Sequence, residues 1–328
     1  MYVKPIKKPL IIKSLEAILR RIPHDHESRE KVSKKLGNYL SGYYGEQSLA
    51  YYLDQLPQKE FNIFHNIRIK TPNITFQIDF LLMTMKFILI LEVKNLTGQL
   101  NFDGDLAQLI QTKPNEENKV YNDPVVQASD HKRHLALFLS KNNLHNIPIS
   151  YLVVVTNPNA HITITSTDKN YRDKIIRSNI LIKKISKLCE YYQKEMYSQA
   201  EMKRVSKLIL KSCDETNQDI LKRFGIEKSE IIKGVICDKC GYYPMQRIYG
   251  SWTCDRCKNT ENEVHIQALN DYIYLLDNKI TNCEFRSLLN IQSSKVANTL
   301  LNKLNLKHTG NNKSRTYHLP QNGFDSEF

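Results

Sequence analysis

Several kinds of segment are missing from this sequence of 328 residues. It has no apolar run long enough to cross a membrane, no signal peptide at its start, no low-complexity tract and no internal repeat. These absences argue against a membrane protein, a secreted protein and a repeat protein. We therefore expect a cytoplasmic protein that does not contact a membrane and whose seven cysteines are reduced.

Acidic residues are scarce relative to basic ones. The chain has 34 Asp and Glu against 47 Lys and Arg, so its formal net charge at pH 7 is +13. Such a charge favours non-specific attraction to polyanions. A chain of this length can form two or three domains with ordinary hydrophobic cores.

The apolar run 87–91 ends in an acid-x-Lys triplet. Side chains alternate between the two faces of a strand, so Glu92 and Lys94 point to one face and Val93 to the other. This arrangement is typical of a metal-dependent nuclease centre. The alternative is an ordinary ion pair at the end of a strand.

A second carboxylate is expected beside this triplet. Residues 74–83 predict the preceding strand, with Asp79 on one face. The apolar residues on its other face are Ile74, Phe76, Ile78 and Phe80. If Met85 and Lys86 form a two-residue turn, Asp79 lies opposite Glu92.

Two facing carboxylates need a compensating charge. At a separation of about 5 Å they repel by about 3 kcal/mol at an effective dielectric constant near 20. A divalent cation reverses the sign of this energy, and Mg²⁺ prefers one or two carboxylates with water and phosphate oxygens. The cation can activate water, while Lys94 positions that water or stabilises the transition state.

Glu46 and Gln127 are further candidates. In a predicted helix over residues 46–56, Glu46 lies on the same face as the apolar residues Leu49, Ala50, Leu53 and Leu56, where a carboxylate needs a partner. The alternative for Glu46 is stabilisation by the dipole at the N-terminus of this helix. Asp123 and Pro124 predict the start of a helix over residues 124–140, with Gln127 in its opening turns. The alternative for Gln127 is a solvated side chain.

The predicted order of these elements is helix, three strands, helix and strand. The strands cover residues 61–69, 74–83, 87–94 and 149–156, which gives the αβββαβ order of the PD-(D/E)XK nuclease core. With its motifs, the chain resembles the nuclease-related domain family, NERD, over residues 40–160. The motifs are Gly42-x-x-Gly45-Glu46, Ile78-Asp79, Leu91-Glu92-Val93-Lys94-Asn95 with Gly98, and Asn122-Asp123-Pro124-x-x-Gln127.

The resemblance implies a nuclease-like fold that uses Mg²⁺ or Mn²⁺. It implies Asp79 and Glu92 as metal ligands, with Glu46, Lys94 and Gln127 completing the site. The sequence departs from the family pattern in having Asn122-Asp123-Pro124 where Asn-Pro is commoner, and in lacking glycine before Phe87. Neither departure touches a proposed ligand.

Four cysteines predict a zinc site. Two C-x2-C pairs, separated by thirteen residues, are Cys237 with Cys240 and Cys254 with Cys257. This spacing is typical of a zinc ribbon with one tetrahedral ion, and four cysteines leave no open position for water, so the Zn²⁺ is structural. Two disulfides are the alternative. Cys189, Cys213 and Cys283 are interpreted as packing residues. Basic residues that would give the ribbon a basic surface are Lys239, Arg247, Arg256 and Lys258.

Residues 264–319 predict three helices and a hairpin, a pattern that resembles a winged helix-turn-helix. The caps are Thr281 with Glu284 for the second helix, and Ser293 or Ser294 for the third. Seven Lys and Arg stand against three acidic residues. The candidate nucleic-acid contacts are Arg286, Lys295, Asn298, Thr299, Asn302, Lys303, Lys313 and Arg315. A protein-binding domain and a small helical domain with a solvated basic face are alternatives.

The predicted organisation has six segments. They are a basic helical segment (1–41), a NERD-like domain (42–160), a helical extension (161–232), a zinc ribbon (233–262), a winged-helix-like domain (263–320) and a tail (321–328). We expect a cytoplasmic, bacterial, Mg²⁺-dependent deoxyribonuclease that binds DNA through the ribbon and the winged helix. The alternatives are RNA as substrate, and a non-catalytic DNA-binding regulator or scaffold. The sequence leaves the oligomeric state and the role of residues 1–41 open.

Overall fold

The computed structural model describes residues 1–72, 74–144, 147–214, 219–311 and 314–324. The chain divides into two compact units, each built from two segments. Unit 1 consists of Met1–Pro9 and Leu40–Glu215, and unit 2 consists of Leu10–Tyr39 and Thr216–Phe328. The mixed α/β class that the sequence predicts is confirmed.

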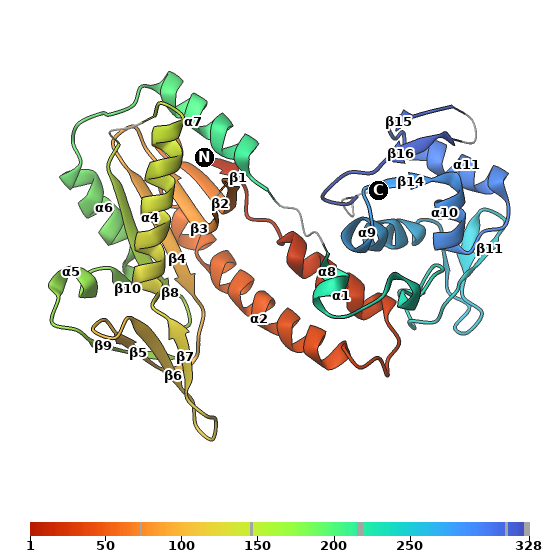
Figure 1. The fold of residues 1–328 in the computed structure, drawn as a ribbon, viewed down its shortest axis with the longest axis horizontal. Helices are drawn as coiled ribbons and strands as arrows, with labels where there is room; N and C mark the ends of the chain where they lie inside the picture. Colours follow the sequence, from red (N-terminus) through yellow and green to blue (C-terminus); the bar gives the residue numbers. More distant parts are fainter. Residues whose placement is uncertain (73, 145–146, 215–218, 312–313, 325–328) are drawn as a thin grey trace. The chain divides into compact units, whose positions relative to one another are not determined.

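A six-stranded sheet forms the centre of unit 1 (Figure 1). In spatial order its strands are β1 (Tyr2–Lys4), β2 (Asn62–Lys70), β3 (Thr75–Met83), β4 (Ile88–Lys94), β8 (Ile149–Val155) and β10 (Ile175–Arg177). β2, β3 and β4 pair antiparallel, whereas β8 pairs parallel with both β4 and β10. The buried, nearly continuous apolar sequence of β4 is what a strand covered on both faces requires.

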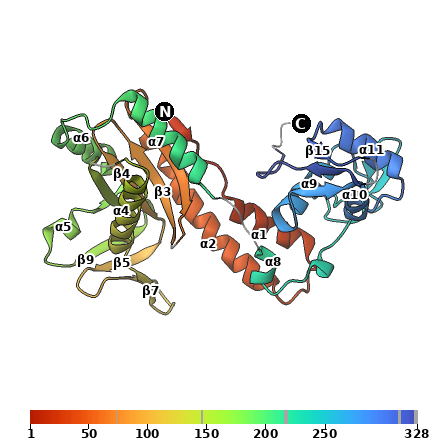
Figure 2. The same ribbon diagram turned by 45° about the horizontal axis from the view of Figure 1, so that its top comes forward.

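Helices cover both faces of this sheet. One apolar core includes residues of α4 (Pro124–Lys141) and α7 (Gln199–Ser212), and the other includes residues of α3 (Ala50–Leu53) and α6 (Leu181–Tyr191). Figure 2 shows α4 lying across the sheet. Asp123 caps α4 by accepting a hydrogen bond from the backbone N–H of Val125, and Pro124 occupies the first turn, as the sequence predicts.

A second, four-stranded sheet lies beside the first turns of α4. Its order is β7 (Lys119–Asn122), β6 (Gln108–Thr112), β5 (Gly98–Asp103) and β9 (Ala160–Thr165). Leu100 and Phe102 pack with Val125 and Ala128 of α4. The short helix α5 (Lys169–Arg172) and the 3₁₀ turn η1 (Ser178–Ile180) follow β9. The sequence analysis does not foresee this sheet, because its strands are short and half-exposed.

The predicted apolar face of β3 is wrong at Ile74, which precedes the strand and is exposed, and at Phe80. Phe76 and Ile78 pack in the core that contains α4, but Phe80 packs with Leu82 in the opposite core. The alternation of side chains therefore shifts between Ile78 and Phe80. The neighbouring strand has its irregularity at the same level, because Asn66 takes a left-handed conformation with φ of 51°.

The helix predicted over residues 46–56 is also wrong in its start. Glu46 belongs to the last turn of the long helix α2 (Arg29–Ser48), and α3 begins only at Ala50. Ser48 ends α2 by donating a side-chain hydrogen bond of 2.7 Å to the carbonyl of Gly45. No helix begins at Glu46, so stabilisation by an N-terminal dipole is excluded.

Gly45 lets this end of α2 approach the carboxyl end of β4. A Cβ atom at Gly45 would lie 2.4 Å from the Cβ of Asn95 and 2.9 Å from the hydroxyl of Thr156. Asn95 in turn donates a side-chain hydrogen bond of 2.7 Å to the carbonyl of Ser41. A Cβ at Gly42, by contrast, would meet nothing within 4 Å.

Unit 2 contains helices and two small sheets. Its helices are α1 (Leu10–Arg21), the first part of α2, α8 (Ile220–Arg223), α9 (His265–Leu275), α10 (Asn282–Leu289) and α11 (Ser294–Lys303), with a 3₁₀ turn η2 (Lys228–Glu230). One sheet has the order β11 (Gln246–Ile248), β12 (Ser251–Thr253) and β13 (Thr260–Glu261). The other has the order β14 (Lys279–Thr281), β16 (Thr316–His318) and β15 (His308–Thr309).

The caps predicted in this unit are confirmed. Thr281 and Glu284 form a capping box at the start of α10, and Ser293 caps α11. The predicted hairpin is present as β15 paired antiparallel with β16, and β14 adds a third strand that the sequence analysis misses. The classification of these elements as a winged helix remains a prediction.

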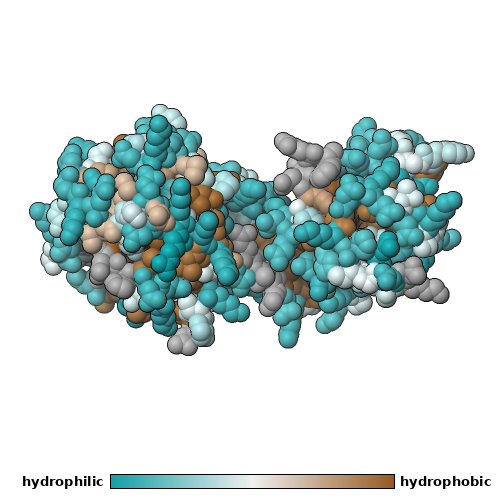
Figure 3. Space-filling model, turned by 90° about the horizontal axis from the view of Figure 1, so that it is seen from above, coloured by the Kyte–Doolittle hydropathy of each residue, from teal (hydrophilic) through white to brown (hydrophobic). Residues whose placement is uncertain are grey.

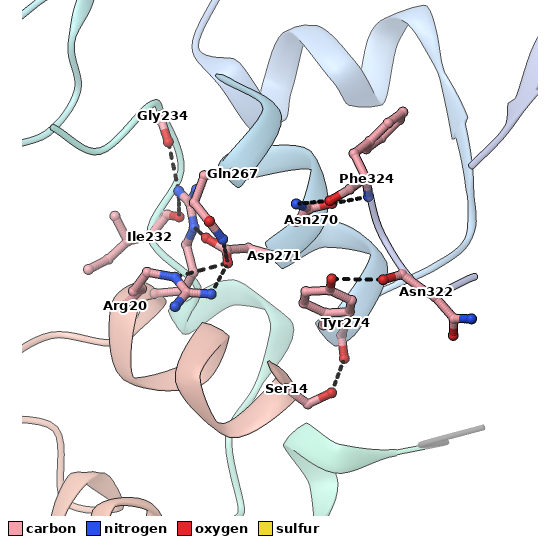
Figure 4. Close-up of polar contacts among 11 residues, drawn as sticks. Ser14, Arg20, Ile232, Gly234, Gln267, Asn270, Asp271, Tyr274, Asn322 and Phe324 are labelled. Carbon is pink, nitrogen blue, oxygen red and sulfur yellow. Dashed lines mark hydrogen bonds and ion pairs between the residues drawn. The ribbon is translucent and has the colours of Figure 1, made fainter. Parts of the chain in front are cut away.

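Ion pairs join α1 to α9, and Figure 4 shows Asp271 of α9 bound by Arg20 of α1. Arg21 donates a hydrogen bond of 2.7 Å to one carboxylate oxygen of Asp271, and both side chains are 1% exposed. Arg20 binds the other oxygen, also at 2.7 Å, but its side chain is 35% exposed. Arg21 also donates to the carbonyls of Ile232 and Gly234. The sequence leaves the role of residues 1–41 open, and these contacts give α1, which lies within that segment, a structural role.

Hydrophilic side chains predominate on the face drawn in Figure 3. No helix in the described ranges is both long enough and apolar enough to cross a membrane.

Gly45→Ala tests the close approach of α2. We expect a loss of about 1–3 kcal/mol in the free energy of unfolding, because the new methyl group forces Asn95 or the helix to move. The measurement is urea unfolding followed by circular dichroism. Gly42→Ala is the control, and we expect it to be neutral or to stabilise by up to about 1 kcal/mol because it lies in the same helix with open space around it. Equal effects of the two variants would contradict the argument.

Arg21→Ala tests the buried ion pair. We expect the free energy of unfolding of unit 2 to fall by about 3–5 kcal/mol, because Asp271 loses its fully buried partner. Because the Arg20 side chain is half-exposed, we expect Arg20→Ala to lower the free energy of unfolding by less, about 1 kcal/mol. The single tryptophan, Trp252, lies in unit 2, so its fluorescence during urea unfolding measures this unit. A larger loss for Arg20→Ala than for Arg21→Ala would refute the ranking.

Candidate active site and zinc-binding cluster

The register of β3 and β4 brings Asp79 beside the acid-x-Lys triplet. The pairs Phe80 with Leu91 and Met83 with Ile88 have the register that the predicted two-residue turn requires. Asp79 directly precedes Phe80, the last residue of β3 in this ladder, and so lies next to the Glu92–Lys94 end of β4. Its carboxylate accepts a hydrogen bond of 2.8 Å from the backbone N–H of Val93, which fixes the side chain against β4.

Glu92 and Lys94 form an ion pair at the carboxyl end of β4. The Lys94 Nζ atom lies 2.7 Å from Glu92 Oε1 and 3.3 Å from Gln127 Oε1. Glu92 is 2% exposed, and its second oxygen, Oε2, is buried without a hydrogen bond. The structure therefore brings Glu92, Lys94 and Gln127 together, and Gln127 is a partner of Lys94 rather than a solvated side chain.

The cap of α4 holds Gln127 in this position. The backbone N–H of Gln127 donates to the carbonyl of Asp123. The Asp123 side chain accepts hydrogen bonds of 2.7 Å from both the Val125 N–H and the Tyr171 hydroxyl. Asp123, which the sequence analysis treats only as a cap, is thus a buried support of the site.

Burial and like charges shift the pKa values of the two acids. Burial raises the pKa of Asp79 well above its ordinary value, and the Glu92 and Glu46 carboxylates raise it further. Lys94 and the Val93 N–H partly oppose this rise. Burial also raises the pKa of Glu92, against the lowering effect of Lys94. One lysine does not fully compensate these carboxylates, so an added cation would stabilise their charged forms.

Lys94 stays charged despite its burial. Burial alone lowers the pKa of the Lys94 ammonium, but the attraction of Glu92 and Asp79 outweighs burial and the pKa is raised. A protonated ammonium group beside Glu92 can donate hydrogen bonds to water or to a phosphate oxygen.

Glu46 has a partner that the sequence analysis misses. The Nε2 atom of His65, on β2, makes a hydrogen-bond contact with Glu46 Oε2. His65 is 1% exposed, and its ring centroid lies 6.4 Å from that of Tyr43 and 5.1 Å from that of Phe80. The expectation that the Glu46 carboxylate needs a partner is therefore correct. A lone histidine in an apolar strand was the signal that could have indicated this partner.

The acidic residues have the chemistry of a site for one divalent cation. The buried, unbonded Oε2 atom of Glu92 is a free ligand atom, and Asp79 lies on the adjacent strand. These carboxylates do not gather as tightly as the cysteines of unit 2. Among the residues that the structure describes, only the four cysteines form a group of three or more His, Cys, Asp or Glu with all ligand atoms within 4.8 Å.

Comparison with known families agrees with this geometry. Residues 41–156 match the profile of the nuclease-related domain. The chain contains a NERD domain. The match includes all five residues that the sequence analysis assigns to the catalytic site, and it ends before β9 and the four cysteines of unit 2. No curated protein and no solved structure matches the chain.

The four cysteines of unit 2 form a cluster that could hold a metal ion. Their Sγ atoms all lie within 4.8 Å of one another, with Cys237 and Cys257 3.6 Å apart and Cys240 and Cys254 3.5 Å apart. These separations exclude the disulfide alternative, because bonded sulfur atoms are about 2.0 Å apart. The cluster fits a structural Zn²⁺ held by four thiolates, as expected for a zinc ribbon.

Each pair of cysteines lies in the same type of turn. The backbone N–H of Gly241 donates to the carbonyl of Cys237, and the N–H of Lys258 donates to the carbonyl of Cys254. Both donors have positive φ, 69° at Gly241 and 59° at Lys258. The backbone thus aims two sulfur atoms from each turn at one point.

The other three cysteines differ from one another. Cys189 and Cys213 are half-buried, as a packing role requires. Cys283 is exposed, so its interpretation as a packing residue is wrong. It is the second residue of α10, whose apolar face is formed by Phe285, Leu288 and Leu289.

Most of the candidate contact residues of α11 lie on its outer face. The exposed side chains are Lys295, Asn298, Thr299, Asn302 and Lys303, while Ala297, Leu300 and Leu301 are buried. Asn298 accepts a hydrogen bond from Asn282. Arg315 is half-buried, and Lys313 lies outside the described residues.

Two arginines have structural contacts. Arg286 donates to the Asn282 side chain and to the carbonyl of Gln292, which ties α10 to the loop before α11. Arg247 is half-buried, with its guanidinium 5.1 Å from the centre of the Trp252 ring. Of the predicted basic residues of the ribbon, Lys239, Arg256 and Lys258 are exposed.

Cys254→Ser tests the zinc cluster. We expect the purified protein to contain one equivalent of Zn²⁺, and the variant to bind it weakly and unfold more readily, because structural Zn²⁺ contributes folding energy directly. Elemental analysis gives the metal content, and Trp252 fluorescence gives the stability of unit 2. Cys283→Ser is the matched control and should retain the metal. A wild-type protein without zinc that is equally stable in EDTA would contradict this assignment.

Proposed function

We propose that the NERD domain hydrolyses DNA phosphodiester bonds with a Mg²⁺ or Mn²⁺ ion held by Asp79 and Glu92. The observation that carries this proposal is the buried Oε2 atom of Glu92, which has no hydrogen bond although Oε1 binds Lys94. A buried carboxylate oxygen without a partner is costly, by about 1–3 kcal/mol or more. A cation would satisfy it. The bound ion would activate water and neutralise charge on the phosphate.

The residues of the chain would prepare the reacting groups. Lys94, held by Glu92 and Gln127, would orient the attacking water or donate a hydrogen bond to the phosphate as negative charge develops. The Val93 N–H would keep Asp79 in place. Glu46, oriented by His65, would complete the acidic side of the site.

Unit 2 would hold the nucleic acid. The exposed outer face of α11 and the exposed basic residues of the zinc ribbon can contact phosphates. Another basic surface supports binding of a polyanion. A cavity of about 400 Å³ is lined by Lys31, Lys34, Lys35, Asn38, Arg223 and Phe224, so four of its six lining residues are cationic and none is acidic.

The second candidate is a non-catalytic DNA-binding regulator or scaffold. Two observations favour it: Glu46 is already paired with His65, and no three acidic ligands gather in the described part of the NERD domain. The two functions differ in their need for the cation and for Glu92. RNA remains the alternative substrate.

Cleavage of supercoiled plasmid, of linear single- and double-stranded DNA and of RNA, with Mg²⁺, Mn²⁺ or EDTA, tests the proposal. We expect metal-dependent cutting, with a rate at least about 100-fold lower in Glu92→Gln and in Lys94→Ala, because each variant removes a charge used in the transition state. Lys70→Ala, exposed at the end of β2, is the control and should cut normally.

Binding measurements separate the two candidate functions. If the wild-type protein and Glu92→Gln bind DNA equally and neither cuts any of these substrates, the regulator function replaces the nuclease. If cutting continues in EDTA or in Glu92→Gln, the proposed metal site is wrong.

A further inference from the structure

Helix α4 presents a second side chain to the site, one turn after Gln127. His131 lies four positions further along α4, so it shares a face of the helix with Gln127. It is 9% exposed, and its Nδ1 atom is buried without a hydrogen bond. This atom lies 3.6 Å from Glu92 Oε2, the carboxylate oxygen that also has no hydrogen bond.

His131 Nδ1 and Glu92 Oε2 are therefore neighbouring buried atoms that both lack a hydrogen bond. Each carries a desolvation cost of about 1–3 kcal/mol if nothing binds it. A separation of 3.6 Å is too long for a hydrogen bond between them. A cation or a water molecule bound between or beside these two atoms would satisfy both of them.

The His131 ring packs beside the ring of Phe76, with the two ring centroids 6.4 Å apart. A neutral imidazole has one nitrogen with a free lone pair, which is the form that binds metals.

The distance also suits two ligands of one ion. Ligand atoms at about 2.1 Å from a common cation lie about 3.0 Å apart at a right angle and about 3.4 Å apart at a tetrahedral angle. The observed 3.6 Å exceeds the tetrahedral value by about 0.2 Å and the right-angle value by about 0.6 Å. Small rotations of the two side chains would close the difference.

We propose that His131 Nδ1 and Glu92 Oε2 are ligands of the same divalent cation, which gives the NERD site a mixed nitrogen and oxygen ligand set. This inference rests on the proposed function in placing a cation at Glu92. Imidazole binds first-row transition ions better than it binds Mg²⁺. The site therefore prefers Mn²⁺ to Mg²⁺, although carboxylates alone would accept either ion.

The first test is pulsed electron paramagnetic resonance of Mn²⁺ added to the full-length protein, loaded with Zn²⁺ and then freed of excess zinc. We expect a ¹⁴N modulation from a directly bound imidazole. The modulation should disappear in His131→Gln and persist in His134→Ala, a matched control on the same helix. This readout does not depend on catalysis.

Calorimetric titration with Mn²⁺ and with Mg²⁺ gives the second test. We expect His131→Gln to weaken Mn²⁺ binding by about 10-fold or more, consistent with loss of one ligand, and to change Mg²⁺ binding much less. Circular dichroism and thermal unfolding establish that the variant is folded. The wild-type spectrum needs no variant, so the proposal can be tested even if His131→Gln fails to fold.

The outcomes distinguish this inference from the proposed function. If Glu92→Gln abolishes Mn²⁺ binding but the wild-type spectrum has no ¹⁴N modulation, the cation is at Glu92 without His131, and only the present inference fails. A water bridging the two atoms would give that result. If Glu92→Gln binds Mn²⁺ as the wild type does, both this inference and the proposed metal site fail.

Discussion

The burial of Glu92 and Lys94 at the end of β4 is the constraint on which the NERD site depends. A charged pair at this depth needs several supports, because each ion loses most of its hydration. Oε1 of Glu92 is satisfied by Lys94, and Lys94 is bridged to Gln127. Asp79 is anchored to the backbone of β4. Two buried atoms, Oε2 of Glu92 and Nδ1 of His131, remain without a hydrogen bond. These two unsatisfied atoms lie next to each other, which is the physical reason to propose a cation beside Glu92 and His131.

Unit 2 depends on a second buried charge. Asp271 on α9 is bound by both Arg20 and Arg21, and Arg21 also binds the carbonyls of Ile232 and Gly234. Residues 10–39 are thereby part of the same compact unit as the zinc cluster and α9 to α11. Along the chain, most of the NERD-containing unit is inserted between the two segments of unit 2. A truncation intended to isolate residues 216–328 would remove both arginine partners of Asp271 and leave only Gln267 of the side chains that bind it.

Much of the site was predictable because its signals are local. Strand alternation placed Glu92 and Lys94 on one face, and the turn length gave the register of β3 against β4. Capping residues located α4, and the spacing of the cysteines located the zinc cluster. The wrong predictions concern residues whose position depends on packing against distant parts of the chain. Phe80 packs on the other face from Ile78, beside the left-handed Asn66, and the helix containing Glu46 ends where a start was predicted.

By itself, the sequence determined the elements of the NERD core, the identity of its charged residues and the cysteine pairs, because these follow from periods and spacings of a few residues. Only the tertiary structure decided which atoms are left unsatisfied. His65 and His131 are separated from Glu46 and Glu92 by 19 and 39 positions in the sequence, and each pair meets because strands and helices pack together. The same is true of Arg21 and Asp271, 250 positions apart. Burial turns such encounters into strong interactions, and burial is a property of the packed fold rather than of any segment.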